Sequence, residues 1–202
     1  MNDIQIVKGH LLSKVGARLN MLAIDDMAET LVGTRDSGIV EQTLQRLWRQ
    51  KNNRFSHEYV YEARTGSQTL GVITCYPTKL LNRLAWPTAK QLLTIRKWPL
   101  VSYVFSHLGS VWSVLTLREG REDEFHIGTL ATLPESRGLG IGTKLLRHAE
   151  GIAREQGYKK MSLTVKQKNE PARRLYERMG YEVTDRLDKK PFFLYRMVKP
   201  LA

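Results

Sequence analysis

Cysteine is almost missing from this chain of 202 residues, because Cys75 is the only one. A single cysteine excludes an internal disulfide framework. No group of cysteine and histidine residues has the spacing of a zinc site, so we expect no metal. The N-terminal stretch MNDIQIVKGH also lacks the apolar core of a secretory signal. Together these absences lead us to expect a protein of the reducing cytoplasm.

Acidic residues are in short supply as well. The sequence has 20 Asp and Glu residues against 32 Lys and Arg, which gives a formal net charge of +12 and a sequence pI near 9.9. The field of such a basic protein attracts polyanions. No basic heptad or RNA-recognition signature directs this charge to nucleic acid, so we expect no specific nucleic-acid partner. A phosphorylated cofactor is the other candidate for an anionic ligand.

Formal charge is absent from one segment, Trp98–Leu117, which is long enough to cross a bilayer. Proline, glycine, histidine and hydroxyl side chains dilute it below the Leu, Ile and Val content of a spanning helix. These residues are Pro99, Ser102, Ser106, His107, Gly109, Ser110, Ser113 and Thr116. We therefore expect no transmembrane span, and we expect a buried or partner-facing helix instead.

The composition, 42% hydrophobic and 26% charged, fits a single domain covering residues 1–202. Apolar patterns and turn residues predict strands at 4–7, 57–63, 68–76, 124–133, 161–165, 181–186 and 192–198. Helical spacing predicts helices at 11–31, 37–50, 140–156 and 170–179, the last capped by Asn169. Between the third and fourth strands lies an apolar and basic insertion, at about 78–117. We expect it to form two or three helices, although Val111–Leu117 is also compatible with a strand.

Three alternating glycines, Gly138, Gly140 and Gly142, separate the fourth strand from the helix that follows it. The start of a helix presents unpaired N–H groups, and it binds phosphate where no side chain blocks the approach. Arg137 adds a positive charge that can hydrogen-bond a phosphate. A flexible turn explains the same glycines without a ligand, so these residues alone leave both interpretations open. The run lacks the Gly-Lys-Ser/Thr ending of a nucleoside triphosphate loop.

Two motifs in this order resemble those of the GNAT superfamily of N-acetyltransferases. Residues Arg137–Gly142, RGLGIG, match the pyrophosphate signature R/Q-x-x-G-x-G/A. Residues Asn169–Tyr181, NEPARRLYERMGY, match the segment N-x-x-A-x-x-L-Y-x-x-x-G-F/Y at the usual separation. The resemblance is strong from about residue 124 to 198 and says nothing about the insertion.

The resemblance implies an α/β (α+β) fold with a mixed, mostly antiparallel central sheet flanked by helices. Its fourth and fifth strands splay apart, and acetyl-CoA lies in the gap as co-substrate. The pantetheine arm pairs with the fourth strand, and the pyrophosphate meets the glycine loop. The cofactor-binding residues that the resemblance implies are Leu130, Ala131, Thr132, Arg137, Gly138, Leu139, Gly140, Ile141, Gly142, Thr143, Asn169 and Tyr176.

Acetyl transfer to an amine needs a neutral nitrogen, a polarised carbonyl and a proton for the departing thiolate. The resemblance places the general acid at Tyr176, a residue that its local pattern also explains as part of the core. The fifth-strand glutamate found in some members is replaced here by Thr164. His126 on the fourth strand is our first candidate for the base. Glu124, two residues earlier and on the same face of an ideal strand, is the second.

The implied acceptor is a primary amine of a small molecule or peptide, and the residues 11–50 and 78–117 beside the cleft are expected to select it. A non-catalytic acyl-CoA sensor and a basic nucleic-acid or ribosome-associated module are the alternatives. The apolar insertion also suggests a homodimer or a membrane-peripheral surface. The aromatic residues that would be buried there are Trp86, Trp98, Tyr103, Phe105 and Trp112.

Overall fold

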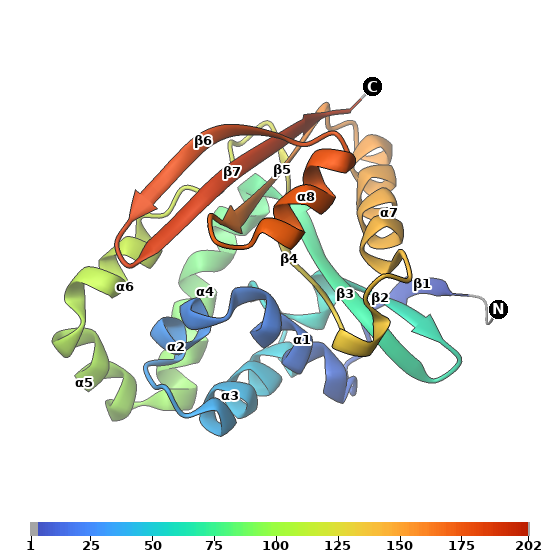
Figure 1. Ribbon diagram of the computed structural model, residues 1–202. Helices are drawn as coiled ribbons and strands as arrows, with labels where there is room; N and C mark the ends of the chain where they lie inside the picture. The colour runs from blue at the N-terminus through green and yellow to red at the C-terminus, as the bar shows by residue number, and fades with distance from the viewer. Residues whose placement is uncertain (1–3, 202) are drawn as a thin grey trace.

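The computed structural model describes residues 4–201, and its strands form one sheet in the order β1-β2-β3-β4-β5-β7-β6 (Figure 1). The strands are β1 (Gln5–Lys8), β2 (Val60–Thr65), β3 (Gln68–Pro77), β4 (Phe125–Thr132), β5 (Lys160–Lys166), β6 (Glu182–Lys189) and β7 (Phe192–Pro200). Neighbouring strands are antiparallel except for the parallel pair β4 and β5. The predicted mixed, mostly antiparallel sheet is confirmed.

Helices cover both faces of this sheet. They are α1 (Lys14–Ile24), α2 (Asp26–Val32), α3 (Ser37–Arg49), α4 (Thr78–Arg96), α5 (Trp98–Ser106), α6 (Leu108–Leu115), α7 (Ile141–Glu155) and α8 (Glu170–Arg178), with short 3-10 turns η1 (His57–Tyr59) and η2 (Pro134–Ser136). The insertion between β3 and β4 is α4 to α6, so the expectation of two or three helices is confirmed. Among the described residues, none of these helices combines the length and apolarity needed to span a bilayer.

Two hydrophobic clusters lie on opposite sides of the sheet. Ile73 of β3 packs in the cluster that contains Leu145 and Leu146 of α7. Its neighbour Val72 packs in the other cluster, with Leu44 and other residues of α1 and α3. Successive residues of a strand point to opposite faces, which explains this division. The result is three layers with the sheet in the middle (Figure 1).

Besides shifts of a few residues at the ends of elements, three features differ from the sequence predictions. The helix predicted over 11–31 is broken at Asp25, whose φ of 45° ends α1 before α2 begins. The first residues of the strand predicted at 57–63 form η1 instead. The alternative strand at Val111–Leu117 is wrong, because its first residues belong to α6. Because β3 already pairs with β2 and β4, neither edge of β3 is free for an additional strand.

A bulge in β4 shapes the centre of the sheet. Cys75 of β3 pairs with Ile127, and Thr74 pairs with Thr129, so Gly128 is an extra residue in β4. A side chain at Gly128 would place its Cβ 2.4 Å from the Tyr76 hydroxyl. Glycine is therefore required for the approach of that tyrosine, and the bulge adds twist to the strand.

The parallel pair β4 and β5 separates after a short contact. Phe125–Ile127 pair with Met161–Leu163, and beyond these residues the two strands no longer pair with each other. On the other side, a buried polar cluster ties β4 to α1, since the Thr129 hydroxyl donates to Asn20 Oδ1 at 2.9 Å. The predicted splay of the fourth and fifth strands is confirmed, and it opens the space in which the candidate site lies.

Candidate active site

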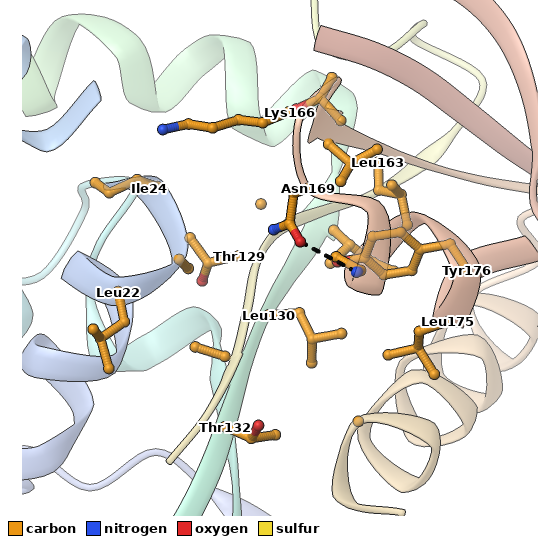
Figure 2. Close-up of a pocket in the computed structure, with 18 of the residues that line it drawn as sticks. Leu22, Ile24, Thr129, Leu130, Thr132, Leu163, Lys166, Asn169, Leu175 and Tyr176 are labelled. Atoms are coloured by element: carbon orange, nitrogen blue, oxygen red, sulfur yellow. Dashed lines mark hydrogen bonds between the residues drawn. The ribbon is translucent and has the colours of Figure 1, made fainter. Parts of the chain in front are cut away.

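A cavity of about 650 Å³ occupies the gap between β4 and β5. Residues of β4, the glycine loop, β5 and α8 line one part of it, and residues of α1 and α2 line the other. Figure 2 shows Leu22 of α1 on one side of β4, with Leu175 and Tyr176 of α8 on the opposite side. The cavity therefore runs across both sides of the strand that carries Leu130.

The glycine loop forms the end of the cavity at the start of α7. Gly138 and Gly140 have φ values of 80° and 72°, in the left-handed region that favours glycine. A Cβ on Gly140 would meet no atom within 4 Å, so the space in front of it is open. Because the first α7 backbone bond runs from Lys144 N–H to the Gly140 carbonyl at 3.0 Å, the earlier N–H groups have no acceptor within the helix. They can receive an anion.

The structure brings the implied cofactor-binding residues together at this cavity, with one exception. Those that line it are Leu130, Ala131, Thr132, Arg137, Gly138, Gly140, Ile141, Gly142, Thr143, Asn169 and Tyr176. Leu139 is not among the lining residues, and its side chain is exposed. The β4 backbone beyond Ile127 pairs with β3 on one edge only, so its other edge faces the cavity.

Tyr176 lies on α8, whose first turn is fixed by a cap. Asn169 accepts a hydrogen bond from the Ala172 N–H at 3.2 Å, and this confirms the predicted N-cap (Figure 2). Tyr176 is 7% exposed, and burial raises the pKa of its phenol to about 12. The phenol therefore keeps its proton at neutral pH, as a proton donor must.

A second group of polar side chains lines the opposite end of the cavity. It consists of Arg54, Tyr76 and Glu119, and the Arg54 guanidinium donates to the Glu119 carboxylate. Burial raises the pKa of Glu119, but Arg54 and His126 outweigh burial and lower it to about 2. Burial also raises the pKa of the Tyr76 phenol to about 12. At neutral pH this end holds one carboxylate, one guanidinium and a neutral phenol.

His126, the first candidate for the base, lies behind this group and does not line the cavity. Its side chain is fully buried, and its Nδ1 lies 3.0 Å from the Ser162 hydroxyl. Its Nε2 lies 3.6 Å from Glu119 Oε2 and has no hydrogen-bond partner among the described residues. Glu119 therefore separates His126 from the cavity.

Glu124, the second candidate, lies outside the cavity and is engaged elsewhere. It precedes β4, where its carboxylate pairs with buried Arg196 of β7 and accepts the Arg121 N–H at 2.8 Å. Burial raises its pKa, while Arg196 and the Arg121 N–H lower it further than burial raises it. The structure does not bring Glu124 and Tyr176 together in one site.

An ion pair joins the two walls of the cavity. Lys166 at the end of β5 lies 2.9 Å from Asp25 Oδ2 and also pairs with Asp26. The lysine points toward the α1 end near Ile24 (Figure 2). Contact with Lys166 lowers the pKa of Asp25. The Lys166 ammonium therefore compensates part of the negative charge of Asp25 and Asp26.

Arg54, Tyr76 and Glu119 were missed by the sequence analysis. They come from the loop after α3, the end of β3 and the charged turn after α6. None of them lies in a motif, and no periodic pattern connects residues so far apart in the chain. Only the closure of the fold brings them to one end of the cavity.

Comparison with known proteins identifies the family. The sequence matches the acetyltransferase (GNAT) family over residues 26–181. It is 32% identical to the "5-NmdU N-acetyltransferase" of Pseudomonas phage PaMx11 over 82 residues, which are 40% of this chain and 56% of that relative. The matched region thus spans little more than half of that curated protein.

Solved structures share the fold. An N-acetyltransferase from Staphylococcus aureus Mu50 has a TM-score of 0.69 at 20% identity, covering 96% of this chain and 99% of the other. A chain from the NatC complex bound to Gag peptide and CoA has a TM-score of 0.53 at 17% identity, covering 99% of both chains. Together with the family match over residues 26–181, these findings show that the chain belongs to the acetyltransferase (GNAT) family.

Proposed function

We propose that this protein is an N-acetyltransferase that moves an acetyl group directly from acetyl-CoA to a primary amine. The observation that carries the proposal is that one cavity contains the glycine-rich start of α7, the unpaired edge of β4 and Tyr176. Family membership supports the same reaction. The single sheet favours one catalytic domain, and the lone, buried Cys75 suits a cytoplasmic protein.

The residues at the glycine loop fit a diphosphate. Arg137 supplies a charged donor, and the first N–H groups of α7 supply neutral donors in front of open space. The free edge of β4 offers backbone groups that can pair with the amides of a pantetheine arm. Acetyl-CoA supplies the activated thioester, and the protein holds it against the splayed strands.

Tyr176 is the proposed general acid. Its phenol lines the cavity on α8, and its raised pKa keeps it protonated throughout the neutral range. It would donate this proton to the departing sulfur, which leaves as a thiol. General acid catalysis by a positioned side chain contributes about 100-fold to 10,000-fold in rate.

His126 is retained as the proposed base, with Glu119 between it and the acceptor amine. Glu119 lines the cavity and would hold the ammonium group of the acceptor. A carboxyl whose pKa is near 2 does not retain a proton at neutral pH. With the Nδ1 proton donated to Ser162, Nε2 is free to accept a proton, and the amine proton would reach it through the Glu119 carboxylate, whose Oε2 lies 3.6 Å from Nε2. The N–H bond of the acceptor breaks, the proton passes over a Glu119 oxygen, and an Nε2–H bond forms.

The lining of the acceptor end favours an amine with an apolar body. Its apolar residues are Leu22, Ile24, Met27, Leu31, Phe55 and Val114. The carboxylates of Asp25 and Glu119 both have a cationic partner within the cavity lining. A polyamine or an aminoglycoside needs several uncompensated carboxylates, so these acceptors fit poorly.

The test is a thiol-release assay with acetyl-CoA and a panel of aliphatic and aromatic monoamines, short peptides, polyamines and aminoglycosides. We expect turnover with an apolar monoamine or a peptide N-terminus, and about a 100-fold loss in Tyr176→Phe. Tyr181→Phe is the matched control, because Tyr181 is a buried tyrosine beside Tyr176 that does not line the cavity.

Other outcomes would point to the alternatives. Calorimetric binding of acetyl-CoA without thiol release for any acceptor would favour a sensor. Steeply salt-dependent RNA binding without affinity for acetyl-CoA would favour a nucleic-acid module.

The proposed base has its own test. His126→Gln should flatten the pH dependence of kcat/KM near neutrality, whereas Glu122→Gln, which changes an exposed acid three residues after Glu119, should leave it unchanged. An unaltered pH profile in His126→Gln would remove the histidine from the mechanism.

A further inference from the structure

The insertion exposes an unusual amount of aromatic surface. Across α4 to α6, Trp86 is 73% exposed, Trp98 81%, Phe105 74%, Leu108 60% and Trp112 68%. The remaining tryptophan of the chain, Trp48, is buried in the core. Large apolar side chains gathered in one part of a surface mark an interaction site.

These side chains follow the period of the helices. On α4, the exposed residues Lys79, Arg83, Trp86, Lys90 and Leu93 recur at intervals of three or four and so share one face. On α5, Trp98 and Phe105 are separated by two turns, and on α6, Leu108 and Trp112 by one turn. Each helix of the insertion therefore turns an exposed stripe with aromatic or leucine side chains away from the core.

The charge of the insertion has one sign. Residues 78–118 contain six basic residues and no Asp or Glu. The basic residues are Lys79, Arg83, Lys90, Arg96, Lys97 and Arg118. The segment that forms α5 and α6 carries no formal charge, and cations lie on both sides of it in the sequence. On α4, cations share the exposed face with Trp86 and Leu93, and a surface that combines apolar and cationic side chains is complementary to a layer with anionic headgroups above an apolar interior.

We propose that α4 to α6 form a docking surface that lies in the interface of an anionic lipid bilayer. Tryptophan and phenylalanine enter the boundary between headgroups and acyl chains, while lysine and arginine reach anionic headgroups. The helices α5 and α6 have 9 and 8 residues and are separated at His107, so they lie on the bilayer and do not cross it.

The charge also decides between possible occupants of this surface. A second copy would bring the same excess of cations, without any acid of the insertion, to the other side of a two-fold interface, which opposes the homodimer expected from the sequence. A single-stranded nucleic acid requires cations along the same groove as the stacking aromatics. Of the four exposed aromatic residues of the insertion, Trp86 shares a helix face with cations, whereas Trp98, Phe105 and Trp112 belong to the segment without formal charge.

The position of α6 links this surface to the acceptor end of the cavity. This link rests on the proposed function, whereas the docking itself does not. The helix carries exposed Trp112 and also Val114, which lines the acceptor end of the cavity. Docking through Trp112 therefore brings the bilayer within one helix of the place where an amine with an apolar body would bind.

The experiment is flotation of the full chain with vesicles of phosphatidylcholine alone or with about one third phosphatidylglycerol. We expect about tenfold more bound protein on the anionic vesicles, a decrease of this difference at high salt, and a blue shift of tryptophan emission on binding. The double variant Trp98→Ser/Trp112→Ser should bind the anionic vesicles at least about tenfold less than the unaltered protein. Leu12→Ser is the matched control, because Leu12 is an exposed apolar residue outside the insertion.

The charge contribution is tested separately. Lys79→Glu/Lys90→Glu should abolish the preference for anionic vesicles, whereas Lys14→Glu/Arg18→Glu, which changes two exposed cations of α1, should retain it. Failure to float with anionic vesicles, or equal flotation of Trp98→Ser/Trp112→Ser and the unaltered protein, would overturn the proposal. A dimer in light scattering that the same tryptophan variant dissociates, without vesicle binding, would overturn it in favour of a second copy.

Discussion

Replacing Glu119 with glutamine tests the largely enclosed ion pair at the acceptor end of the cavity. The change keeps the shape of the side chain and removes its charge, which leaves the Arg54 guanidinium, whose side chain is 23% exposed, without its partner. The ordinary pKa of 4.5 falls to about 2 in the folded protein. At about 1.36 kcal/mol for each pH unit, this difference corresponds to about 3.4 kcal/mol of stability at neutral pH. It agrees with the ~3 to 5 kcal/mol expected for removing one partner of a buried pair.

The pH dependence has a definite sign. The pKa of Glu119 is lower in the folded state, so its contribution is complete above the ordinary pKa and disappears as the pH falls toward about 2. About half of the contribution, or ~1.7 kcal/mol, remains near pH 3.3. Urea unfolding followed by circular dichroism at pH 7 and near pH 3.3 therefore measures both the size of the effect and its loss.

Glu122→Gln is the control for this prediction, since Glu122 is an exposed acid in the same turn. It should change the free energy of unfolding by less than about 0.5 kcal/mol. If Glu119→Gln unfolds at the same urea concentration as the unaltered protein at pH 7, the ion pair does not contribute as described. A difference that stays constant between pH 7 and pH 3.3 would refute the assigned pKa.

Three further changes test other parts of the site. Burial raises the pKa of Tyr176 to about 12, so the rate of acetyl transfer should not decline through ionisation of this phenol below about pH 11. A decline below about pH 11 that Tyr176→Phe abolishes would contradict the role of Tyr176 as the general acid. Gly140→Val places a branched side chain at a φ of 72° and in front of α7, so calorimetry should show at least about a tenfold loss of acetyl-CoA affinity. Gly151→Ala, a change within α7, should retain the affinity for acetyl-CoA. Asn169→Ala removes the α8 cap and should lower the free energy of unfolding by about 1 kcal/mol in urea titrations; an unchanged value would show that the cap contributes nothing.

Much of the fold could be predicted because local patterns and the tertiary structure agree. The helix predicted at 140–156 appears as α7, since its apolar residues recur at the spacing that the sheet requires. The splay of β4 and β5 was implied by the family resemblance that the two motifs carry, and in the structure the glycine loop and α8 both line the gap. These elements are defined by short stretches of sequence.

The break at Asp25 and the bulge at Gly128 could not be predicted in the same way. Strict alternation places Glu124, His126 and Leu130 on one face of β4. The extra residue at Gly128 reverses the alternation, so Leu130 packs with the cluster that contains Ile127. A bulge depends on how two strands pair, and one strand alone does not record it.

The acceptor end was the least predictable part of the site. Glu119 lies in a charged turn that resembles an ordinary solvated loop in the sequence. Its environment is created by Arg54 and Tyr76, which are 65 and 43 positions away along the chain. Long-range packing, and not a local motif, gives this carboxylate its low pKa.

The most direct test of the central claim is a crystal structure of the protein with bound acetyl-CoA. We expect the diphosphate at the N–H groups that begin α7, the pantetheine along the free edge of β4, and the sulfur within hydrogen-bond reach of the Tyr176 hydroxyl. A thioester bound outside the gap between β4 and β5, or a diphosphate without contact to the loop from Arg137 to Gly142, would contradict it.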